Sequence, residues 1–215
     1  MGRVRSFFDR IHRGLFDVTS LLAPEQQGRL LRVCFEQKHR KLDPWGHAVD
    51  SYEAFKYSKT LESVPARPYR HIVDIGCSEG VFTCLVAQSY PAADVVGIDI
   101  SERALMRARN RAKEVNQRIT FEAIDILNQS PRGTFDLVIC SELLYYLGST
   151  NRLLLGCTKI AALLEPGGFL VLVHPWPESR RLYRHFDTNT ALVRHAEHID
   201  NDSHRPFAVT MYERR

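Results

Sequence analysis

The sequence lacks any apolar run of the roughly 18–20 residues that a membrane-spanning helix needs. Its first 20 residues are rich in arginine, but Asp9 and Asp17 interrupt them and no apolar signal core follows. Neither a secretory signal nor an organelle-targeting helix is therefore expected. We expect no membrane contact and a cytoplasmic protein.

Paired cysteines are also missing. The five cysteines, Cys34, Cys77, Cys84, Cys140 and Cys157, are odd in number and form no C-x-x-C motif. Most of them lie in apolar runs, which is typical of buried thiols in a reducing compartment. The nine histidines show no metal-ligand spacing, so we expect no metal site.

A strong excess of charge of one sign is absent as well. The 215 residues carry a formal net charge of +4, with 44% hydrophobic and 25% charged residues, which is ordinary for a globular domain. The densest basic cluster, residues 103–113, falls on an expected helix, where a solvated outer face is the simplest interpretation. Nucleic-acid binders concentrate their charge more strongly, so we do not expect a nucleic-acid partner.

What the sequence does contain, from residue 71 onward, is a regular alternation of short apolar runs and helical patterns. This alternation builds βαβ units on a parallel sheet that helices cover on both faces. Near the end, two strand patterns flank the turn residues 201–203, which predicts an antiparallel hairpin. The predicted fold is α/β and doubly wound, a Rossmann-like fold whose mostly parallel sheet has seven strands. Strands are predicted at residues 71–75, 94–98, 119–123, 135–140, 169–174, 191–199 and 206–213, and helices at residues 80–90, 102–115, 151–164 and 178–186.

Residues 1–65 follow a different pattern from the core domain predicted for residues 66–215. Apolar residues recur at helical spacing between residues 7 and 16, Pro24 opens a second helix, and residues 51–63 form a third with Ser51 as its N-cap. We therefore predict an N-terminal helical cap that acts as a lid.

The helical pattern of the predicted cap breaks in residues 41–50. Pro44 and Gly46 punctuate this segment, because proline and glycine rarely continue a helix. We expect the break to serve as the hinge of the lid.

The stretch I-V-D-I-G-C-S-E-G, residues 72–80, places an acid and two glycines at the end of the first predicted strand. Ligands of open α/β sheets bind beyond the carboxyl ends of strands, and Gly76 and Gly80 allow close approach there. The Gly-Lys-Ser/Thr of a phosphate loop and the G-x-G-x-x-G of a dinucleotide site are absent, and Asp74 would repel a pyrophosphate. Asp74 therefore favours a cationic ligand without phosphate; capping of the following helix is the alternative.

Two further acids follow the next two predicted strands. Asp99 lies 25 residues after Asp74, at a place where a carboxylate can accept both hydroxyls of a ribose. Asp125 is placed to accept from an adenine amino group, with Ile100 and Ile126 packing against the ring. An ordinary turn role is the alternative for each acid, but acids at the ends of three successive strands are a stronger signal together.

This constellation resembles the class I S-adenosylmethionine-dependent methyltransferases over roughly residues 70–175. The resemblance is carried by D-I-G-C-S-E-G (74–80), G-I-D-I (97–100), A-I-D-I (123–126), F-D-L-V-I-C-S-E-L-L-Y-Y-L (135–147) and L-E-P-G-G-F-L-V-L (164–172). It implies S-adenosylmethionine as the cofactor, S-adenosylhomocysteine as its product, and cofactor contacts from Cys77, Ser78 and Ser141. Many members have Gly-x-Gly where this chain has Cys77-Ser78, so the loop here is slightly narrower.

A narrower resemblance is to the NodS-type methyltransferases. D-P-W (43–45) and S-Y-E-A-F-K-Y (51–57), together with S-E-L-L-Y-Y-L downstream, are similar to that family's pattern. The resemblance implies that Lys56 and Tyr57 lie over the cofactor, with the lysine pairing with its carboxylate, and that Trp45 covers the pocket mouth. Beyond residue 175 the chain matches only in general layout, so the identity of the acceptor carries over poorly.

Three residues are candidates for the chemistry itself. Glu142 follows the fourth predicted strand, where acceptor and cofactor meet, and Tyr145 is placed to line the acceptor pocket. His174 ends the fifth predicted strand and could take a proton from an acceptor amine or hydroxyl. A purely structural role is the alternative for each of the three.

Together these patterns predict a methyltransferase that acts on nitrogen or oxygen of a small molecule, for example an amino sugar or another natural-product metabolite. The alternatives are an RNA or DNA methyltransferase, a non-catalytic S-adenosylmethionine-binding protein and an NAD-dependent dehydrogenase. No N/D-P-P-Y/F motif follows the fourth strand and no separate basic, aromatic-rich module is present, which argues against the first alternative. Intact acids at positions 74, 99 and 125 argue against the second.

Overall fold

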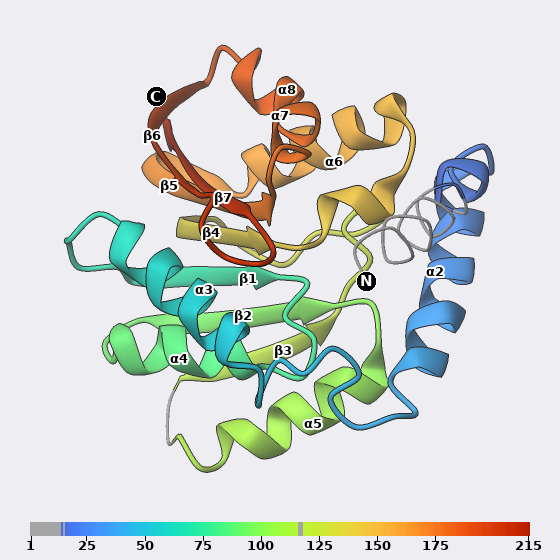
Figure 1. The fold of residues 1–215 in the computed structure, drawn as a ribbon, viewed down its shortest axis with the longest axis horizontal. Helices are drawn as coiled ribbons and strands as arrows, with labels where there is room; N and C mark the ends of the chain where they lie inside the picture. Colours follow the sequence, from blue (N-terminus) through green and yellow to red (C-terminus); the bar gives the residue numbers. More distant parts are fainter. Residues whose placement is uncertain (1–13, 15, 116–117) are drawn as a thin grey trace.

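A seven-stranded mixed sheet forms the centre of the protein (Figure 1). The computed structural model describes residues 14, 16–115 and 118–215, so most of the first predicted helix lies outside the described residues. The strand order is β3-β2-β1-β4-β5-β7-β6, with β1 to β5 parallel and β7 antiparallel to both of its neighbours. The strands are β1 (His71–Ile75), β2 (Asp94–Asp99), β3 (Ile119–Ala123), β4 (Phe135–Ser141), β5 (Leu164–Pro175), β6 (Leu192–Asp200) and β7 (Phe207–Arg214).

Helices cover both faces of this sheet, so the predicted doubly wound fold is confirmed. Alternate residues of β1 divide between two buried clusters: Ile72 packs with α3 and α4 residues, and Val73 and Ile75 pack with α6 residues. Both faces of a parallel strand are therefore apolar, as its unbroken apolar run predicts. The helices are α2 (Pro24–Lys38), α3 (Ser51–Ser63), α4 (Val81–Ser89), α5 (Glu102–Ala112), the 3₁₀ helix η1 (Leu144–Leu147), α6 (Thr150–Ala162), α7 (Ser179–Leu182) and α8 (Arg184–Asp187).

The strand order reverses in the middle of the sheet, between β1 and β4. From β1 the chain continues outward to β2 and β3, and from β4 it continues in the opposite direction to β5. Clefts form outside the carboxyl ends of strands at such a switch point. Figure 1 shows α2 standing across the ends toward which β1 and β2 point. We call α2, residues 39–50 and α3 together the cap.

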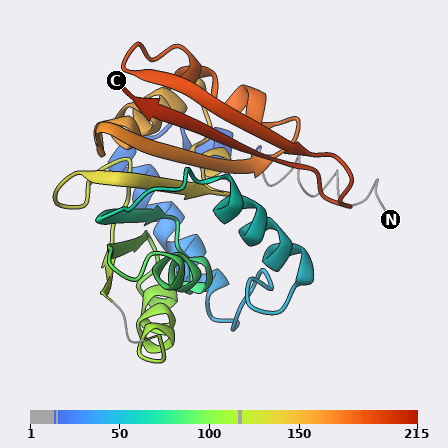
Figure 2. The same cartoon turned by 90° about the vertical axis from the view of Figure 1, so that its left-hand side faces the viewer.

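The C-terminal hairpin is present as predicted and forms one edge of the sheet (Figure 2). Three local predictions were wrong. The helix predicted at residues 178–186 is divided into two short helices, α7 and α8. Asp50, not Ser51, is the N-cap of α3, and its side chain accepts a hydrogen bond from the backbone N–H of Tyr52. β5 begins at Leu164 rather than at residue 169, because Leu164 pairs with Phe135 of β4 across an irregular register.

Four of the five cysteines are buried, as their apolar surroundings predicted, and Cys34 is exposed. None of the helices in the described ranges is long and apolar enough to cross a membrane.

Candidate functional site

A cavity of about 560 Å³ lies at the carboxyl ends of β1, β2 and β4, beneath the cap. Fourteen of the residues predicted for the site line it, and only Gly80 and His174 do not. The structure therefore brings together side chains that are up to a hundred residues apart in the sequence. The lining residues that the sequence singled out are Trp45, Lys56, Tyr57, Asp74, Gly76, Cys77, Ser78, Asp99, Ile100, Asp125, Ile126, Ser141, Glu142 and Tyr145.

The loop after β1 forms the floor of the cavity. Asp74 is buried and accepts a hydrogen bond of 2.7 Å from the Thr83 hydroxyl, and burial raises the pKa of its carboxyl to about 6. Gly76 has a φ of +80°, and a Cβ there would lie 2.8 Å from Leu143 Cδ1. This position requires glycine on both counts, since L side chains rarely adopt that backbone conformation.

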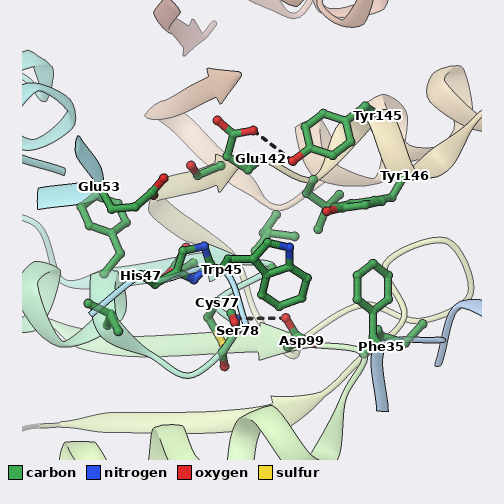
Figure 3. A pocket seen from close by; sticks show the side chains of 18 of the residues that line it. Phe35, Trp45, His47, Glu53, Cys77, Ser78, Asp99, Glu142, Tyr145 and Tyr146 are labelled. Atoms are coloured by element: carbon green, nitrogen blue, oxygen red, sulfur yellow. Dashed lines mark hydrogen bonds between the residues drawn. The ribbon is translucent and has the colours of Figure 1, made fainter. Parts of the chain in front are cut away.

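Asp99 and Ser78 close one end of this loop (Figure 3). The Asp99 carboxylate accepts from the backbone N–H groups of Ser78, at 3.0 Å, and Ser101, at 2.8 Å, while burial raises its pKa. The hydroxyl of Ser78 is buried on the cavity wall and has no hydrogen-bond partner among the described residues. Buried polar atoms nearly always find a partner, so this unpaired hydroxyl indicates a place for a polar ligand atom.

Asp125 follows β3 and completes the row of acids. Its carboxylate accepts from Leu127 N at 3.0 Å and from the Asn128 side chain at 2.6 Å. Ile100 and Ile126 lie beside it in the cavity wall and supply the apolar surface that a flat ring needs.

The opposite end of the cavity holds a cluster of charged groups. Lys56 Nζ lies 3.0 Å from Glu53 Oε2 and 3.2 Å from Glu142 Oε1. Burial opposes the charge on Lys56, but Glu142 and Glu53 outweigh it and raise the pKa of the ammonium. Two carboxylates of the chain itself thus hold Lys56, and the pairing with a cofactor carboxylate that the resemblance implied stays a prediction.

Glu142 sits in a strained backbone position at the end of β4. Its φ is +53°, in the left-handed region that a glutamate seldom adopts. The Tyr145 hydroxyl donates a hydrogen bond of 3.0 Å to its Oε2 (Figure 3). Both carboxylate oxygens of Glu142 are thus engaged, one by Lys56 and one by Tyr145.

The placement of His174 contradicts a role as general base. The side chain is fully buried outside the cavity, and its Nε2 accepts from the backbone N–H groups of Leu143 and Leu144 at 3.2 and 3.0 Å. Its Nδ1 lies 3.0 Å from the Tyr183 hydroxyl, and burial lowers the pKa of the ring to about 3. His174 anchors the turn after β4 instead of facing an acceptor.

Gly80 also has a structural place rather than a cavity position. It has a φ of +72° at the start of α4, and a Cβ there would lie 2.8 Å from that of Ala108. Gly80 therefore lets α4 and α5 approach each other closely.

Sequence reasoning missed many lining residues, and six of them lie on the cap. Trp45 was predicted from its motif, but its aromatic and imidazole neighbours were not: the Phe35 ring lies 6.2 Å away, His39 5.0 Å and His47 5.7 Å. The missed lining residues of the cap are Leu31, Phe35, His39, His47, Tyr52 and Glu53. No local pattern marks them, since only the docking of the cap brings them to the cavity.

Glu79, directly before Gly80, was missed as well and holds the cap to the core. This buried carboxylate accepts from Arg107 at 2.6 Å and from the backbone N–H of Asp43 at 3.1 Å, and lies 3.3 Å from His39 Nδ1.

In the described residues no group of three or more His, Cys, Asp or Glu side chains is arranged to hold a metal ion.

A model of the methyltransferase domain family matches residues 68–208, about two thirds of the chain. The chain belongs to this methyltransferase family. The family prediction is thereby confirmed. The match begins just before β1 and ends at the start of β7, so it contains β1 to β6 and leaves out the cap.

Individual methyltransferases are similar to parts of the chain. Nodulation protein S of Sinorhizobium fredii (strain NBRC 101917 / NGR234) is 31% identical over 137 residues, 62% of this chain and 62% of that protein. The trans-aconitate 2-methyltransferase of Deinococcus radiodurans is 35% identical over 132 residues, 59% of this chain and 48% of that protein. The matched part thus spans less than two thirds of either relative.

The fold has a counterpart among solved structures. The N-methyltransferase NodS from Bradyrhizobium japonicum WM9, in complex with S-adenosyl-L-homocysteine, superposes with a TM-score of 0.73 over 85% of this chain and 97% of that chain. Sequence identity is 23%, so this likeness concerns the fold.

Proposed function

We propose that this methyltransferase-family protein transfers a methyl group from S-adenosylmethionine to nitrogen or oxygen of a small molecule, with S-adenosylhomocysteine as the other product. One observation carries the proposal: Asp74, Asp99 and Asp125 line a single cavity at the switch point of the sheet. Carboxylates at three strand ends suit a nucleoside that is positively charged and has no phosphate.

The residues present fit this cofactor. Asp99 is placed to accept the ribose hydroxyls, and Asp125 is placed to accept the adenine amino group above the apolar wall of Ile100 and Ile126. The unpaired Ser78 hydroxyl, in the loop after β1, offers a hydrogen bond to the polar amino-acid end. When bound, S-adenosylmethionine supplies a methyl carbon activated by a sulfonium, and the electron pair of the broken carbon–sulfur bond stays on sulfur.

The charged end of the cavity supports an amine as the acceptor. Glu53 and Glu142 share one ammonium, that of Lys56, so this cluster has an excess of one negative charge. Arg205 comes within 3.9 Å of Glu53, but its closer partner is Asp50 at 2.6 Å. A protonated amine, such as the amino group of an amino sugar, is attracted to this cluster, whereas an acidic acceptor is repelled.

The cofactor part of the proposal is tested by titrating the protein with S-adenosylhomocysteine in a calorimeter. Asp99→Ala should raise the Kd at least about tenfold, since a lost pair of charge-assisted hydrogen bonds costs upward of about 1.4 kcal/mol. Asp94→Ala is the matched control, because Asp94 lies at the other, exposed end of the same strand. An unchanged Kd for a folded Asp99→Ala variant, with Asp99→Asn behaving alike, would sink the proposal.

The acceptor part is tested with labelled S-adenosylmethionine and three acceptors: glucosamine, catechol and trans-aconitate. We expect label on glucosamine, and a lower rate for Glu142→Gln, which removes the charge but keeps the shape. Transfer to trans-aconitate alone would contradict the amine preference while leaving the methyl transfer intact.

A further inference from the structure

Three histidines lie in or beside the cavity, and their ring nitrogens differ in what they contact. His174 uses both nitrogens in buried hydrogen bonds, and His39 places Nδ1 against Glu79. His47 lines the cavity, yet its ring nitrogens make no hydrogen bond to any residue that the structure describes. An imidazole that faces a cavity and is not used to hold the fold is available for chemistry.

The backbone at His47 is firmly held, so its ring is positioned before any ligand arrives. The Asp43 carboxylate accepts from the backbone N–H of His47 at 2.7 Å and from that of Ala48 at 3.0 Å. The imidazole ring stacks on Trp45 with an interplanar angle of 16°. In the view of Figure 3, His47 and Trp45 lie between the Glu142–Tyr145 pair and the Ser78–Asp99 pair.

The charged groups that act on the His47 ring come from its own segment, from α3 and from the end of β4. Asp43 belongs to its own segment, Glu53 and Lys56 come from α3, and Glu142 comes from the end of β4. Burial lowers the pKa of the imidazole and Lys56 adds to this effect, against the opposite influence of the three carboxylates. The ring is therefore neutral at neutral pH and able to accept a proton.

The two cavity residues that the sequence offered for the chemistry, Glu142 and Tyr145, are already engaged. Glu142 has Lys56 on one oxygen and Tyr145 on the other, and Tyr145 is a donor in that pair. Burial raises the pKa of the Tyr145 hydroxyl well above its usual range, so it does not become a phenolate near neutral pH.

We propose that His47 is the general base that takes a proton from the ammonium of the acceptor. The proposal rests on the proposed methyl transfer to an amine. The proton moves from the acceptor nitrogen to a ring nitrogen of His47, which frees the lone pair that forms the new bond to carbon. The imidazolium then returns the proton to solvent before the next turnover.

The first test is the pH dependence of methyl transfer to glucosamine by the parent protein and by His47→Gln. With a base, the amine reacts in either protonation state as long as His47 is neutral, so kcat/KM rises only up to the pKa of His47, below 6.5, and is then level. Without the base, the amine must lose its proton to water first, so kcat/KM keeps rising up to the pKa of the amine. We expect a loss of about 100-fold at pH 7, since general bases contribute about 10²–10⁴-fold, and a much smaller loss at pH 9.

The second test needs no turnover. The C2 proton of His47, assigned by its disappearance in His47→Gln, is followed by NMR as the pH is varied in the presence of S-adenosylhomocysteine. We expect it to titrate below 6.5. A ring that stays protonated well above neutral pH could not accept the proton and would overturn the proposal.

His71→Gln is the matched control for both tests, since His71 is half exposed at the opposite end of β1. A His47→Gln variant that binds S-adenosylhomocysteine normally and shows the parent pH profile would overturn the role of His47 and leave the methyl transfer standing. If the parent itself bound no S-adenosylhomocysteine or methylated no amine, the proposed function would fail first, and the role of His47 with it.

Discussion

His174 shows how one buried side chain orders the site without facing it. Because its Nε2 accepts two backbone N–H groups, that nitrogen carries no proton, and the neutral ring donates through Nδ1 to the Tyr183 hydroxyl. The turn at Leu143 and Leu144 is thereby fixed directly after Glu142. The strained φ of Glu142 persists because its surroundings hold it.

The low pKa of His174, about 3, leads to a stability prediction. Below pH 6.5 the unfolded chain binds a proton at this residue that the folded chain does not, so stability falls as the pH falls from 6.5 toward 3. This one group should remove about 1.4 kcal/mol of stability between pH 7.5 and pH 5.5. His174→Gln should be less stable at pH 7.5 by about 1–3 kcal/mol, because the amide cannot reach both the two buried N–H groups and the Tyr183 hydroxyl as the ring does, and the gap should narrow at pH 5.5.

Urea unfolding of the parent and the variant at the two pH values measures both effects. His71→Gln, at a half-exposed position, should change stability by less than about 0.5 kcal/mol at either pH. A constant gap between parent and His174→Gln would show that the ring is not held neutral in the folded protein.

All seven strands could be predicted from the sequence, and the start of one of them could not. β1 and β3 have their predicted bounds because a short apolar run between turn residues has few alternatives. β5 begins five residues early, at Leu164, because pairing with β4 carries the strand through Pro166 and two glycines, which read as a turn in the sequence. The pairing with β4 sets where β5 begins, and the local sequence pattern contains no information about that pairing.

The same division applies to the site. The acids could be predicted because they directly follow strands whose carboxyl ends meet at one edge of the sheet. Residues of the cap such as His47 and Glu53 could not, since their position depends on how α2 and α3 dock onto the core. The boundary predicted between residues 65 and 66 and the lid role of the cap stay predictions.

The docking of α2 depends on Gly28, which packs against the acid after β3. A Cβ at this position would lie 1.8 Å from Asp125 Oδ2 and 2.8 Å from Asn128 Nδ2, so Gly28→Ala must displace the helix or the acid. Alanine favours the helix itself by about 1 kcal/mol, hence helicity should be kept. We expect the affinity for S-adenosylhomocysteine to fall about tenfold or more while the far-UV circular dichroism is unchanged.

Arg29→Ala provides the comparison, since Arg29 is exposed on the same helix. It should leave the calorimetric Kd within about twofold of the parent value. Equal affinities for Gly28→Ala and the parent would mean that the contact between α2 and Asp125 does not shape the cofactor site.

On the scale of the whole molecule, the cavity is enclosed by segments that are distant in sequence and joined at separate points. At one end the Gln27 side chain donates a hydrogen bond of 3.0 Å to the Leu147 carbonyl. At the other end the Tyr52 hydroxyl donates a hydrogen bond of 2.7 Å to the Arg205 carbonyl. This bond connects α3 to the loop of the C-terminal hairpin. Between these ends, Glu79 joins the non-helical segment of residues 39–50 to the loop after β1.

Glu79 is the joint whose loss should free the middle of the cap without unfolding the core. In Glu79→Gln the contacts to Arg107, His39 and the Asp43 N–H lose a charged acceptor, and such hydrogen bonds are worth about 1.5–3 kcal/mol each. Backbone amides of residues 39–50 should therefore exchange with deuterium at least about tenfold faster, and those of β1 should not. As a control, Glu122→Gln changes an exposed glutamate on β3. It should leave the amide exchange rates of residues 39–50 and of β1 unchanged. Because residues 39–50 cover the cavity, the Kd of S-adenosylhomocysteine should rise as their amide exchange becomes faster. Faster exchange with an unchanged Kd would show that closure of this segment is not linked to cofactor binding.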